Sequence, residues 1–193
     1  MVQRTPGAIG SSTRALGIAL QAMAMEADMK DKTAVILMVV LTVAAVGQLV
    51  AAVKLYGRDG NELLRNAGWL VMTLSAVFGW LPIYTLRRKG GVPEGKSYVH
   101  TTALVDTGIY GIVRHPQYLA GVLVSVALPL ITQHWLVAVL GAVAIVVYYV
   151  DAGQEDQRCI DKFGDSYRGY MESVPQMNFV LGIARAMRRS TGA

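Results

Sequence analysis

Residues 119–150, LAGVLVSVALPLITQHWLVAVLGAVAIVVYYV, decide the fold, because about 32 positions pass without a lysine, arginine, aspartate or glutamate. A transmembrane helix needs about 20 apolar residues, so this run is too long for one perpendicular crossing. Pro129 and the polar pair Gln133-His134 interrupt it. The run therefore predicts a tight hairpin of two helices, the second over residues 135–150.

The composition of the whole chain also indicates a polytopic membrane protein. Of its 193 residues, 53% are hydrophobic and only 16% are charged, which is too apolar for an ordinary soluble domain. The apolar residues gather in long runs instead of alternating with polar ones, so we expect an all-α helical bundle and not a transmembrane barrel. The net charge of +5 comes from basic residues that flank the apolar runs. This distribution is typical of contacts with membrane lipids and not of nucleic-acid binding.

Two further apolar segments precede the hairpin. Residues 33–53 are the first, about 21 positions without a charge, and residues 66–86 are the second. Gln48 is the one strongly polar residue inside the first span, and we expect it to bond a neighbouring helix rather than a ligand. Trp69 and Tyr84, near the ends of the second span, are typical interfacial anchors. With the hairpin, these segments predict a bundle of about four to five transmembrane helices.

The N-terminal segment, residues 1–32, contains no apolar run long enough to span a membrane. We expect it to be peripheral or disordered, with at most a short interfacial helix over residues 15–25. Its start is barely basic, so it does not resemble a cleaved signal peptide. Residues 33–193 are expected to form a single membrane domain. Three later methionines are candidate starts of a shorter chain: Met23, Met25 and Met29.

Four crossings would place both termini on one side of the membrane, and the positive-inside tendency identifies that side as cytoplasmic. The basic residues on it are Arg87, Arg88, Lys89, Lys96, Arg114, Arg158, Lys162, Arg185, Arg188 and Arg189. The turn of the hairpin has no lysine or arginine, whereas the first short loop counts against this orientation with Lys54, Arg58 and Arg65. The topology brings residues 90–117 and 151–170 to the same cytoplasmic face. We expect any reaction to occur there.

Polar side chains adjoin the start of the long apolar run. Residues 108–121 read GIYGIVRHPQYLAG, and Arg114, His115 and Pro116 stand where a chain entering a membrane should already be apolar. Spacing alone leaves two interpretations open. In one, Arg114 extends to lipid phosphates, His115 lies at the interface and Pro116 occupies the first turn of the next helix. In the other, the three belong to a functional site.

Acidic and aromatic residues after the hairpin have the same two interpretations, since the pair Glu155-Asp156 can be solvated and tyrosines can be interfacial. The combination is more specific than its parts. Residues 105–110 read VDTGIY, residues 114–118 read RHPQY, and residues 155–170 read EDQRCIDKFGDSYRGY. The series resembles the membrane methyltransferase superfamily that includes isoprenylcysteine carboxyl methyltransferases and phospholipid N-methyltransferases, over roughly residues 100–180.

Within this resemblance, VDTGIY looks like the family's Val-x-x-Gly-x-Tyr, and the last segment like its Glu-Glu-x-x-Leu-x-x-x-Phe-Gly-x-x-Tyr-x-x-Tyr. Three positions depart from the pattern. Ala120 stands where many relatives have a glycine, and Gly121 follows one position late. Asp156 replaces the second glutamate. Cys159 replaces an apolar leucine, and we expect it to be a small core residue.

The resemblance implies S-adenosylmethionine as the cofactor, held between the Arg-His-Pro segment and the acidic pair under a cytoplasmic cap. Glu155 is suited to pair with the cofactor's ammonium, and His115 to bond its ribose, base or carboxylate. Tyr110 or Tyr118 could face the sulfonium, whose positive charge favours an aromatic surface. Arg114 offers a bidentate fork for a carboxylate of the cofactor or of the substrate. The expected catalytic residues are Arg114 and Glu155, the expected cofactor-binding residues are Tyr110, His115, Pro116, Tyr118, Glu155, Asp156 and Tyr167, and no metal ligand is expected.

The implied reaction is in-line methyl transfer to a lipophilic acceptor that enters from the bilayer. The protein would hold donor and acceptor in alignment and keep water away. A carboxylate acceptor would need Arg114 to orient it, and an amine would need a base, for which Glu155, Asp156 and His115 are candidates. Carboxylates, amines and thiols all remain open as acceptors. The oligomeric state is also open, although Ser75 and the small residues of the first two spans permit close helix contacts.

Two other functions fit parts of the sequence. Sterol reductases share an Arg-His-x-x-Tyr segment and a Cys-x-x-Lys-[Tyr/Phe]-Gly segment, which residues 159–164, CIDKFG, resemble. An NADPH-dependent membrane reductase is therefore an alternative, although those relatives are much longer. A non-catalytic membrane scaffold is the other alternative. The motif series favours the methyltransferase.

Overall fold

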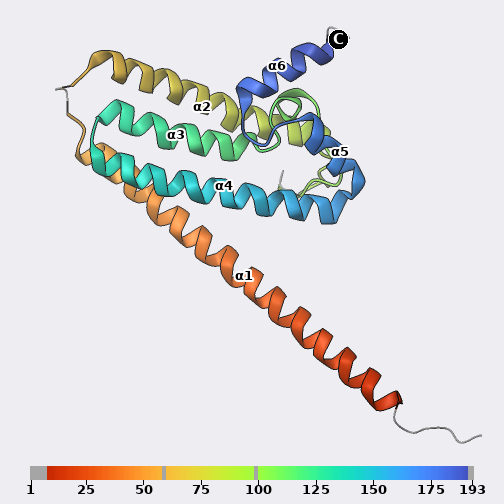
Figure 1. Ribbon diagram of the computed structural model, residues 1–193. Helices are drawn as coiled ribbons and strands as arrows, with labels where there is room; N and C mark the ends of the chain where they lie inside the picture. Colours follow the sequence, from red (N-terminus) through yellow and green to blue (C-terminus); the bar gives the residue numbers. More distant parts are fainter. Residues whose placement is uncertain (1–7, 58–59, 98–99, 191–193) are drawn as a thin grey trace, which may run out of the picture. The chain divides into compact units, whose positions relative to one another are not determined.

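The computed structural model describes residues 8–57, 60–97 and 100–190, and every regular element among them is a helix (Figure 1). The elements are α1 (Ala8–Lys54), α2 (Glu62–Lys89), η1 (Gly108–Gly111), α3 (Pro116–Thr132), α4 (Trp135–Phe163), α5 (Asp165–Ser173) and α6 (Phe179–Ser190), of which η1 is a short 3-10 helix. The expectation of an all-α fold is confirmed. The chain divides into two compact units, residues 1–39 and 40–193, with the boundary inside α1.

Three helical segments of the described residues are long and apolar enough to cross a membrane: Lys32–Lys54, Glu62–Lys89 and Trp135–Phe163. They contain the first two expected spans and the second arm of the expected hairpin. Helix α3, the first arm, is apolar but only 17 residues long. At the helical rise it extends about 26 Å, somewhat less than the hydrocarbon core of a bilayer, about 30 Å. Three of the expected four to five crossings thus have helices of full length.

The N-terminal part of the chain is more regular than expected. Residues 8–32 belong to α1 and continue into the first candidate span without a break. This segment is rich in alanine and lacks proline, so its intrinsic helix propensity is high. Residues 1–7 of the expected peripheral segment, and Arg58 of the first short loop, lie outside the described residues.

The hairpin turns at Gln133-His134 and not at Pro129. Gln133 adopts the left-handed conformation, with φ 51° and ψ 35°, and its N–H donates to the Pro129 carbonyl at 2.8 Å. The His134 side chain then caps α4 by accepting from the Leu136 N–H at 3.2 Å. Pro129 lies in the last turn of α3, and the Ser125 carbonyl that its missing N–H cannot bond accepts from Gln48 Nε2 at 3.0 Å instead.

Helix α4 continues well beyond the apolar run. Residues 151–163, expected as a separate amphipathic segment, extend the same helix to Phe163. Gly164, with φ 60°, ends it, and α5 begins at the next residue. Ion pairs one turn apart support such a polar extension, here between Arg158 and Glu155 at 2.8 Å. The acidic pair therefore lies on a helix that is anchored in the bundle.

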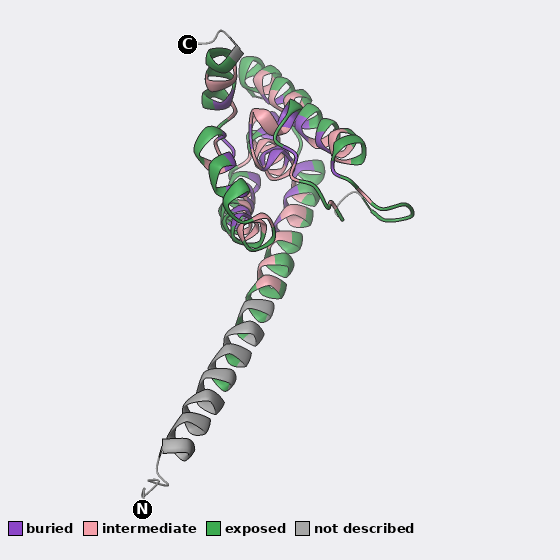
Figure 2. Cartoon of the chain, turned by 90° about the vertical axis from the view of Figure 1, so that its right-hand side faces the viewer, coloured by how far each residue is buried: buried purple, intermediate pink, exposed green. Residues whose placement is uncertain are grey.

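The bundle of α2, α3 and α4 is closely packed, with the buried residues gathered between its helices (Figures 1 and 2). A Cβ atom added to Gly68 of α2 would lie 2.9 Å from the Ile131 nitrogen and 3.0 Å from the Ala127 oxygen of α3. Only glycine permits this approach. The Ser75 hydroxyl donates to the Ala120 carbonyl at 2.9 Å across the same interface. Ser75 therefore makes its close helix contact within the chain, and the oligomeric state stays open.

Gln48, on the part of α1 that belongs to the second unit, is 1% exposed. Its Nε2 donates to the Ser125 carbonyl of α3 at 3.0 Å and to the Val137 carbonyl of α4 at 3.2 Å. The expectation that this glutamine bonds neighbouring helices is confirmed. It joins α1 to both arms of the hairpin.

Candidate functional site

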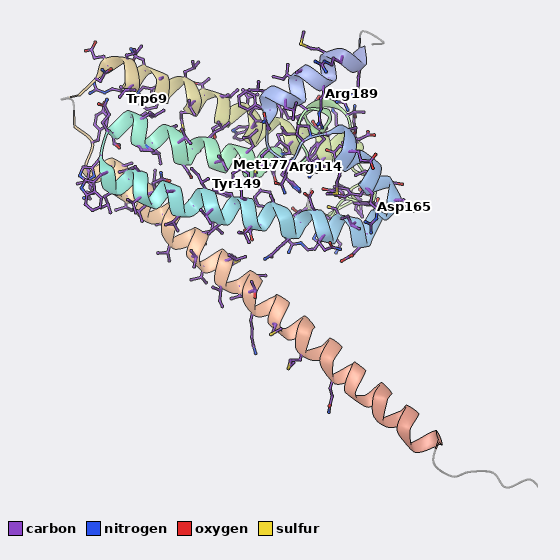
Figure 3. All side chains as sticks on the ribbon, in the orientation of Figure 1. Trp69, Arg114, Tyr149, Asp165, Met177 and Arg189 are labelled. Atoms are coloured by element: carbon purple, nitrogen blue, oxygen red, sulfur yellow. The ribbon has the colours of Figure 1, made fainter. Side chains whose placement is uncertain are left out.

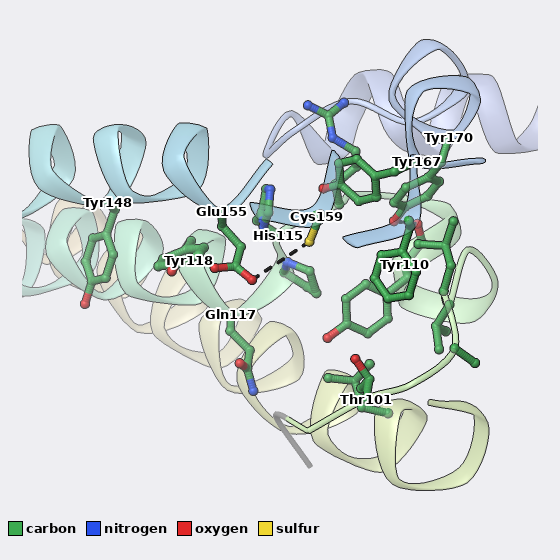
Figure 4. A pocket seen from close by; sticks show the side chains of 17 residues that line it. Thr101, Tyr110, His115, Gln117, Tyr118, Tyr148, Glu155, Cys159, Tyr167 and Tyr170 are labelled. Atoms are coloured by element: carbon green, nitrogen blue, oxygen red, sulfur yellow. Dashed lines mark hydrogen bonds between the residues drawn. The ribbon is translucent and has the colours of Figure 1, made fainter. Parts of the chain in front are cut away.

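A cavity of about 510 Å³ lies at one end of the bundle, the end of Arg114 and not of Trp69 (Figures 3 and 4). It is enclosed by the segment that leads into α3, by the last turns of α4 and by α5. Its volume is in the range that accommodates cofactors and drug-sized ligands. The expected site residues that line it are Tyr110, Arg114, His115, Pro116, Tyr118, Glu155 and Tyr167. The eighth expected residue, Asp156, is not among the lining residues.

Asp156 lies behind the cavity wall, where other side chains surround its carboxylate. Arg114 donates from Nε to Oδ1 at 3.2 Å and from Nη2 to Oδ2 at 2.8 Å. Tyr167 Oη donates to Oδ1 at 2.6 Å, and Gln176 Nε2 donates to Oδ2 at 3.1 Å. His115 Nε2 lies 2.7 Å from Oδ1 and must carry the proton there, because a carboxylate only accepts. We call these five residues the Asp156 cluster.

The burial of this cluster decides between the two interpretations of the Arg-His-Pro segment. The side chains of Arg114 and Asp156 are 8% and 9% exposed, and that of His115 is 7% exposed. An arginine that extended to lipid phosphates would be exposed. The segment is therefore part of a buried polar network and not interfacial.

The guanidinium of Arg114 is bidentate, as expected, but the carboxylate it binds is the protein's own. Its Nη1 donates in addition to the Val174 carbonyl at 2.6 Å and to the Met171 carbonyl at 3.2 Å. These contacts tie the end of α5 to the segment before α3. The fork that was expected to hold a ligand's carboxylate is directed at Asp156 instead.

Backbone hydrogen bonds fix the same segment from a second direction. The Arg114 N–H donates to the Pro175 carbonyl at 3.0 Å, and the His115 N–H to the Gln176 carbonyl at 3.1 Å. Pro116 then starts α3, where its missing N–H would have had no partner within the helix. The wall of the cavity thus depends on residues about 60 positions further along the chain.

Two tyrosines of α5 close the cavity. Burial first, and then the hydrogen bond to Asp156, raises the pKa of the Tyr167 phenol far above its ordinary value. Burial also raises the pKa of Tyr170, whose hydroxyl donates to the Tyr110 carbonyl at 2.6 Å. Both phenols therefore stay protonated at physiological pH and act as hydrogen-bond donors.

Glu155 faces the cavity from α4. Its Oε2 is paired with Arg158, at 2.9 Å from Nε and 2.8 Å from Nη2. Its Oε1 has only the Cys159 thiol, a weak donor, at 3.9 Å (Figure 4). Glu155 is the one carboxylate among the described residues that line the cavity. Its Oε1 can therefore accept from a bound cation.

His115 also presents an acceptor without a partner. In the neutral ring with its proton on Nε2, Nδ1 has a lone pair, and the described residues supply no donor to it. The ring packs edge-on against Tyr118, with centroids 5.6 Å apart. A hydroxyl or amino group in the cavity could donate to Nδ1.

Aromatic rings form two walls of the cavity. Figure 4 shows Tyr110, Tyr167 and Tyr170 on one side and Tyr118 and Tyr148 on the other, with His115 between them. The rings of Tyr118 and Tyr148 are 6.3 Å apart in an edge-on arrangement. An aromatic surface of this kind suits a sulfonium or another soft cation.

Tyr148, which the sequence did not single out, explains the displaced glycine after the Arg-His-Pro segment. A Cβ atom at Gly121 would lie 2.2 Å from Cζ of Tyr148, so only glycine leaves space for the ring. Ala120 is buried and its carbonyl accepts from Ser75. The one sequence signal for Tyr148 is an aromatic residue at the end of an aliphatic run.

Two other residues differ from what the sequence suggested. Cys159 is half-buried: it packs against the buried cluster of Tyr167, Tyr170 and Val174, as expected of a core residue, but it also lines the cavity beside Glu155, which was not expected. Gln176, which completes the Asp156 cluster, was not identified. Its one signal is its position near the end of the stretch, roughly residues 100–180, that resembles the family.

Comparisons with known proteins agree on the type of chemistry. The sequence profile of the family described as phospholipid methyltransferase matches residues 64–165, from α2 to the start of α5. Over 112 residues the chain is 30% identical to methanethiol S-methyltransferase 1 of Bradyrhizobium diazoefficiens. That alignment covers 58% of this chain and 38% of the relative, so the chain spans well under half of the relative's length. No solved structure matches the chain.

Proposed function

The chain belongs to the phospholipid methyltransferase family, and we propose on that basis that it is a membrane methyltransferase that uses S-adenosylmethionine to methylate a lipophilic acceptor. The observation that carries the proposal is one cavity with two available acceptors between aromatic walls: Glu155 Oε1, which has only the weak Cys159 thiol donor, and His115 Nδ1. Both matches name methyltransferases, which favours this reaction over NADPH-dependent reduction and over a scaffold.

The residues present fit the chemical groups of the cofactor. Glu155 Oε1 would accept from its ammonium, a charge-assisted bond in a partly desolvated site. His115 Nδ1 would accept from a ribose hydroxyl or the adenine amino group. The first turn of α3, at Gln117 and Tyr118, presents backbone N–H groups and the positive helix end, which suit its carboxylate.

When bound, the cofactor's sulfonium supplies an electrophilic methyl group: the acceptor's lone pair forms the new bond to carbon, and the carbon–sulfur pair leaves with the sulfur. The protein's part is to align the two reactants and to exclude water. Tyr110 and Tyr118 would face the sulfonium. The hydroxyls of Tyr167 and Tyr170 are bound to Asp156 and to the Tyr110 carbonyl, so they hold the wall in place.

Arg114 and Asp156 act in this proposal as positioning residues. Their charges neutralise each other in the wall, and in the neutral ring the cluster fixes the tautomer of His115 and thereby the acceptor at Nδ1. Asp156 does not line the cavity, so it has no direct role toward the cofactor here. Glu155, His115, Pro116, Tyr110 and Tyr118 form the cofactor-contacting set.

The acid–base groups of the cavity favour an acceptor that ionises readily. Glu155 is the one carboxylate among the lining residues that the structure describes, and the cofactor's ammonium would occupy it. If the cofactor also occupies His115 Nδ1, no further carboxylate or imidazole among the described lining residues is left as a base for an amine, whose pKa of about 10 keeps it protonated. A thiol, with a pKa of about 8.5, or a carboxylate needs less assistance. Because the matched relative is named for methanethiol, a small apolar thiol is the first acceptor to test.

We further propose that the cavity faces the cytoplasm. The end of the bundle that carries it is the end at which α2 finishes with Arg87, Arg88 and Lys89, and the positive-inside tendency places such an end in the cytoplasm. The cofactor would then enter from water, and the acceptor from the bilayer between α3 and α4. Labelling of single cysteines placed before and after α2, in intact cells, tests the orientation.

Methyl transfer itself is tested with the full chain in lipid nanodiscs and S-adenosylmethionine labelled in its methyl group. The acceptors are an alkanethiol, a prenylated cysteine and phosphatidylethanolamine, each assayed with wild type and with Glu155→Gln. We expect label in the thiol product, and less of it with the variant. Transfer to none of the three acceptors by a protein that binds the cofactor would refute the proposed acceptor class.

A further inference from the structure

Helix α6 is attached to the rest of the chain along one face. A Cβ atom on Gly182 would overlap the Ile112 carbonyl, so α6 lies directly against the segment before α3. Phe179 packs on Phe78 of α2, with ring centroids 5.7 Å apart. The Arg189 guanidinium donates to the Gly111 carbonyl at 2.6 Å. These contacts fix which side of α6 is turned away from the protein.

The side that is turned away is apolar. Val180, Ile183 and Met187 are 65%, 42% and 63% exposed. Their spacing of three and four residues aligns them in one row along the helix, and we call them the α6 row. Three large apolar side chains in an exposed row are unfavourable in water. They indicate that a membrane or another molecule covers the row.

The start of α6 lies at the level of the membrane–water boundary. Its Phe179 packs on Phe78, which is two residues before Trp80 and six before Tyr84 on α2. Trp80 and Tyr84 are 77% and 55% exposed, and the Arg88 guanidinium lies 4.5 Å from the centre of the Tyr84 ring. Exposed aromatic residues followed by basic ones, near the end of an apolar helix, are typical of the interface between headgroups and acyl chains.

The charges on α6 complement an anionic surface. The helix contains Arg185, Arg188 and Arg189 and no acidic residue, and α2 ends with three basic residues. An apolar row beside arginines on a short helix is the pattern of helices that lie in the plane of a membrane. Anionic lipids attract such helices by about 1 kcal/mol for each basic residue near the surface.

We propose that α6 lies in the membrane interface, with the α6 row in the acyl-chain boundary and its arginines among the headgroups of anionic lipids. The proposal does not depend on methyl transfer. The segment over residues 175–178 connects the cavity wall to α6. Its carbonyls at residues 175 and 176 accept from Arg114 and His115 on one side, and α6, bound to the lipid surface, would hold its other end. Anionic lipid would then support the wall of the cavity from outside.

The test is the depth of a spin label on α6 in the full chain, reconstituted in vesicles. A nitroxide is attached to Ile183→Cys in a Cys159→Ser background, and its relaxation is measured with oxygen, which enters lipid, and with a nickel chelate, which stays in water. Glu172→Cys on α5 serves as the water-exposed reference, and Val143→Cys on α4 as the lipid-exposed reference. Met187→Cys replaces Ile183→Cys if the latter does not fold.

In vesicles that contain phosphatidylglycerol we expect the α6 label to be oxygen-accessible and protected from nickel, as at residue 143. In vesicles of pure phosphatidylcholine, the fraction of α6 labels that are exposed to lipid should be lower. Arg188→Gln should lower the preference for phosphatidylglycerol about fivefold, whereas Arg168→Gln on α5 should leave it unchanged. Nickel accessibility equal to that at residue 172 would overturn the proposal. Protection from both reagents would also overturn it, because a second protein chain would then cover the row.

Discussion

Arg114 lines the cavity and forms a bidentate ion pair with Asp156 behind it, while Glu155, the direct neighbour of Asp156, faces the cavity. Successive residues of an α-helix point about 100° apart, so adjacent acids on α4 face different surroundings. One is enclosed by protein donors, and the other remains available to a ligand. Adjacent acids therefore have separate roles, and this separation can be tested.

Removing the charge of Asp156 should destabilise the protein strongly. Asp156→Asn leaves the buried guanidinium of Arg114 without its counterion, which costs about 3–5 kcal/mol. Asp156→Glu keeps the charge but adds a methylene to a packed site, at about 1–3 kcal/mol. Glu155→Gln should change stability little. Thermal unfolding in one detergent compares the three variants, and equal midpoints for Asp156→Asn and Glu155→Gln would contradict the separation of roles.

The raised pKa of Tyr167 predicts a loss of stability at high pH. Below about pH 10 the phenol is protonated in both folded and unfolded chains, so its contribution is fully present. Above that pH the unfolded chain releases the proton and the folded chain retains it, which lowers the free energy of unfolding by about 1.4 kcal/mol per pH unit. Tyr167→Phe should lower the number of protons released on unfolding at this pH by about one, and the slope of the free energy of unfolding against pH should become shallower accordingly. An unchanged slope in denaturant titrations from pH 9 to 11 would refute it.

Gly121 and Gly153 offer a matched pair of glycine substitutions. Gly121→Ala would push the ring of Tyr148 out of its position, since the added Cβ would lie 2.2 Å from it. Gly153→Ala meets nothing within 4 Å and should stabilise α4 by about 0.5–1 kcal/mol. We expect the first variant to raise KM for the acceptor and to leave cofactor affinity unchanged. The reason is that the proposed path of the acceptor runs between α3, which carries Gly121, and α4, which carries Tyr148. Equal kinetics for both variants would contradict a contact between Tyr148 and the acceptor.

Arg158 should compete with the cofactor for Glu155. Its guanidinium occupies Oε2, and its positive charge opposes an incoming ammonium. Glu155→Gln is expected to weaken binding of S-adenosylhomocysteine about tenfold, roughly 1.4 kcal/mol, the energy of a charge-assisted hydrogen bond. Arg158→Gln should strengthen binding or leave it unchanged. Weaker binding with Arg158→Gln would indicate that Arg158 itself contacts the cofactor.

Much of the fold could be predicted from the sequence, because hydropathy and helix periodicity are local signals. The candidate spans and the turn near Gln133 follow from them, and so does the role of Gln48 in bonding a neighbouring helix, although not its partners. The end of α4 could not be predicted, since polar residues continue a helix as readily as they end one. Pro129 was expected to help divide the apolar run, but α3 continues past it, and Gln48 bonds the Ser125 carbonyl that the proline leaves free.

Most residues of the candidate site could be predicted from the sequence, but the directions of their side chains and their hydrogen bonds could not. Sequence spacing brings Arg114 and Asp156 to the same end of the bundle, yet it does not give the rotation of α4 that directs Asp156 away from the cavity. The hydrogen bonds from Arg114 and His115 to residues 175 and 176 are non-local and leave no periodic signal. Gln176 and Tyr148 were missed for this reason.

The most direct test of the central claim is calorimetric titration of the purified full chain with S-adenosylhomocysteine and, separately, with NADPH. We predict micromolar binding of S-adenosylhomocysteine, weakened by Glu155→Gln at an unchanged yield of folded protein, and no binding of NADPH. Binding of NADPH alone would contradict the account and indicate a reductase. Binding of neither by a folded chain would show that the cavity does not serve this cofactor.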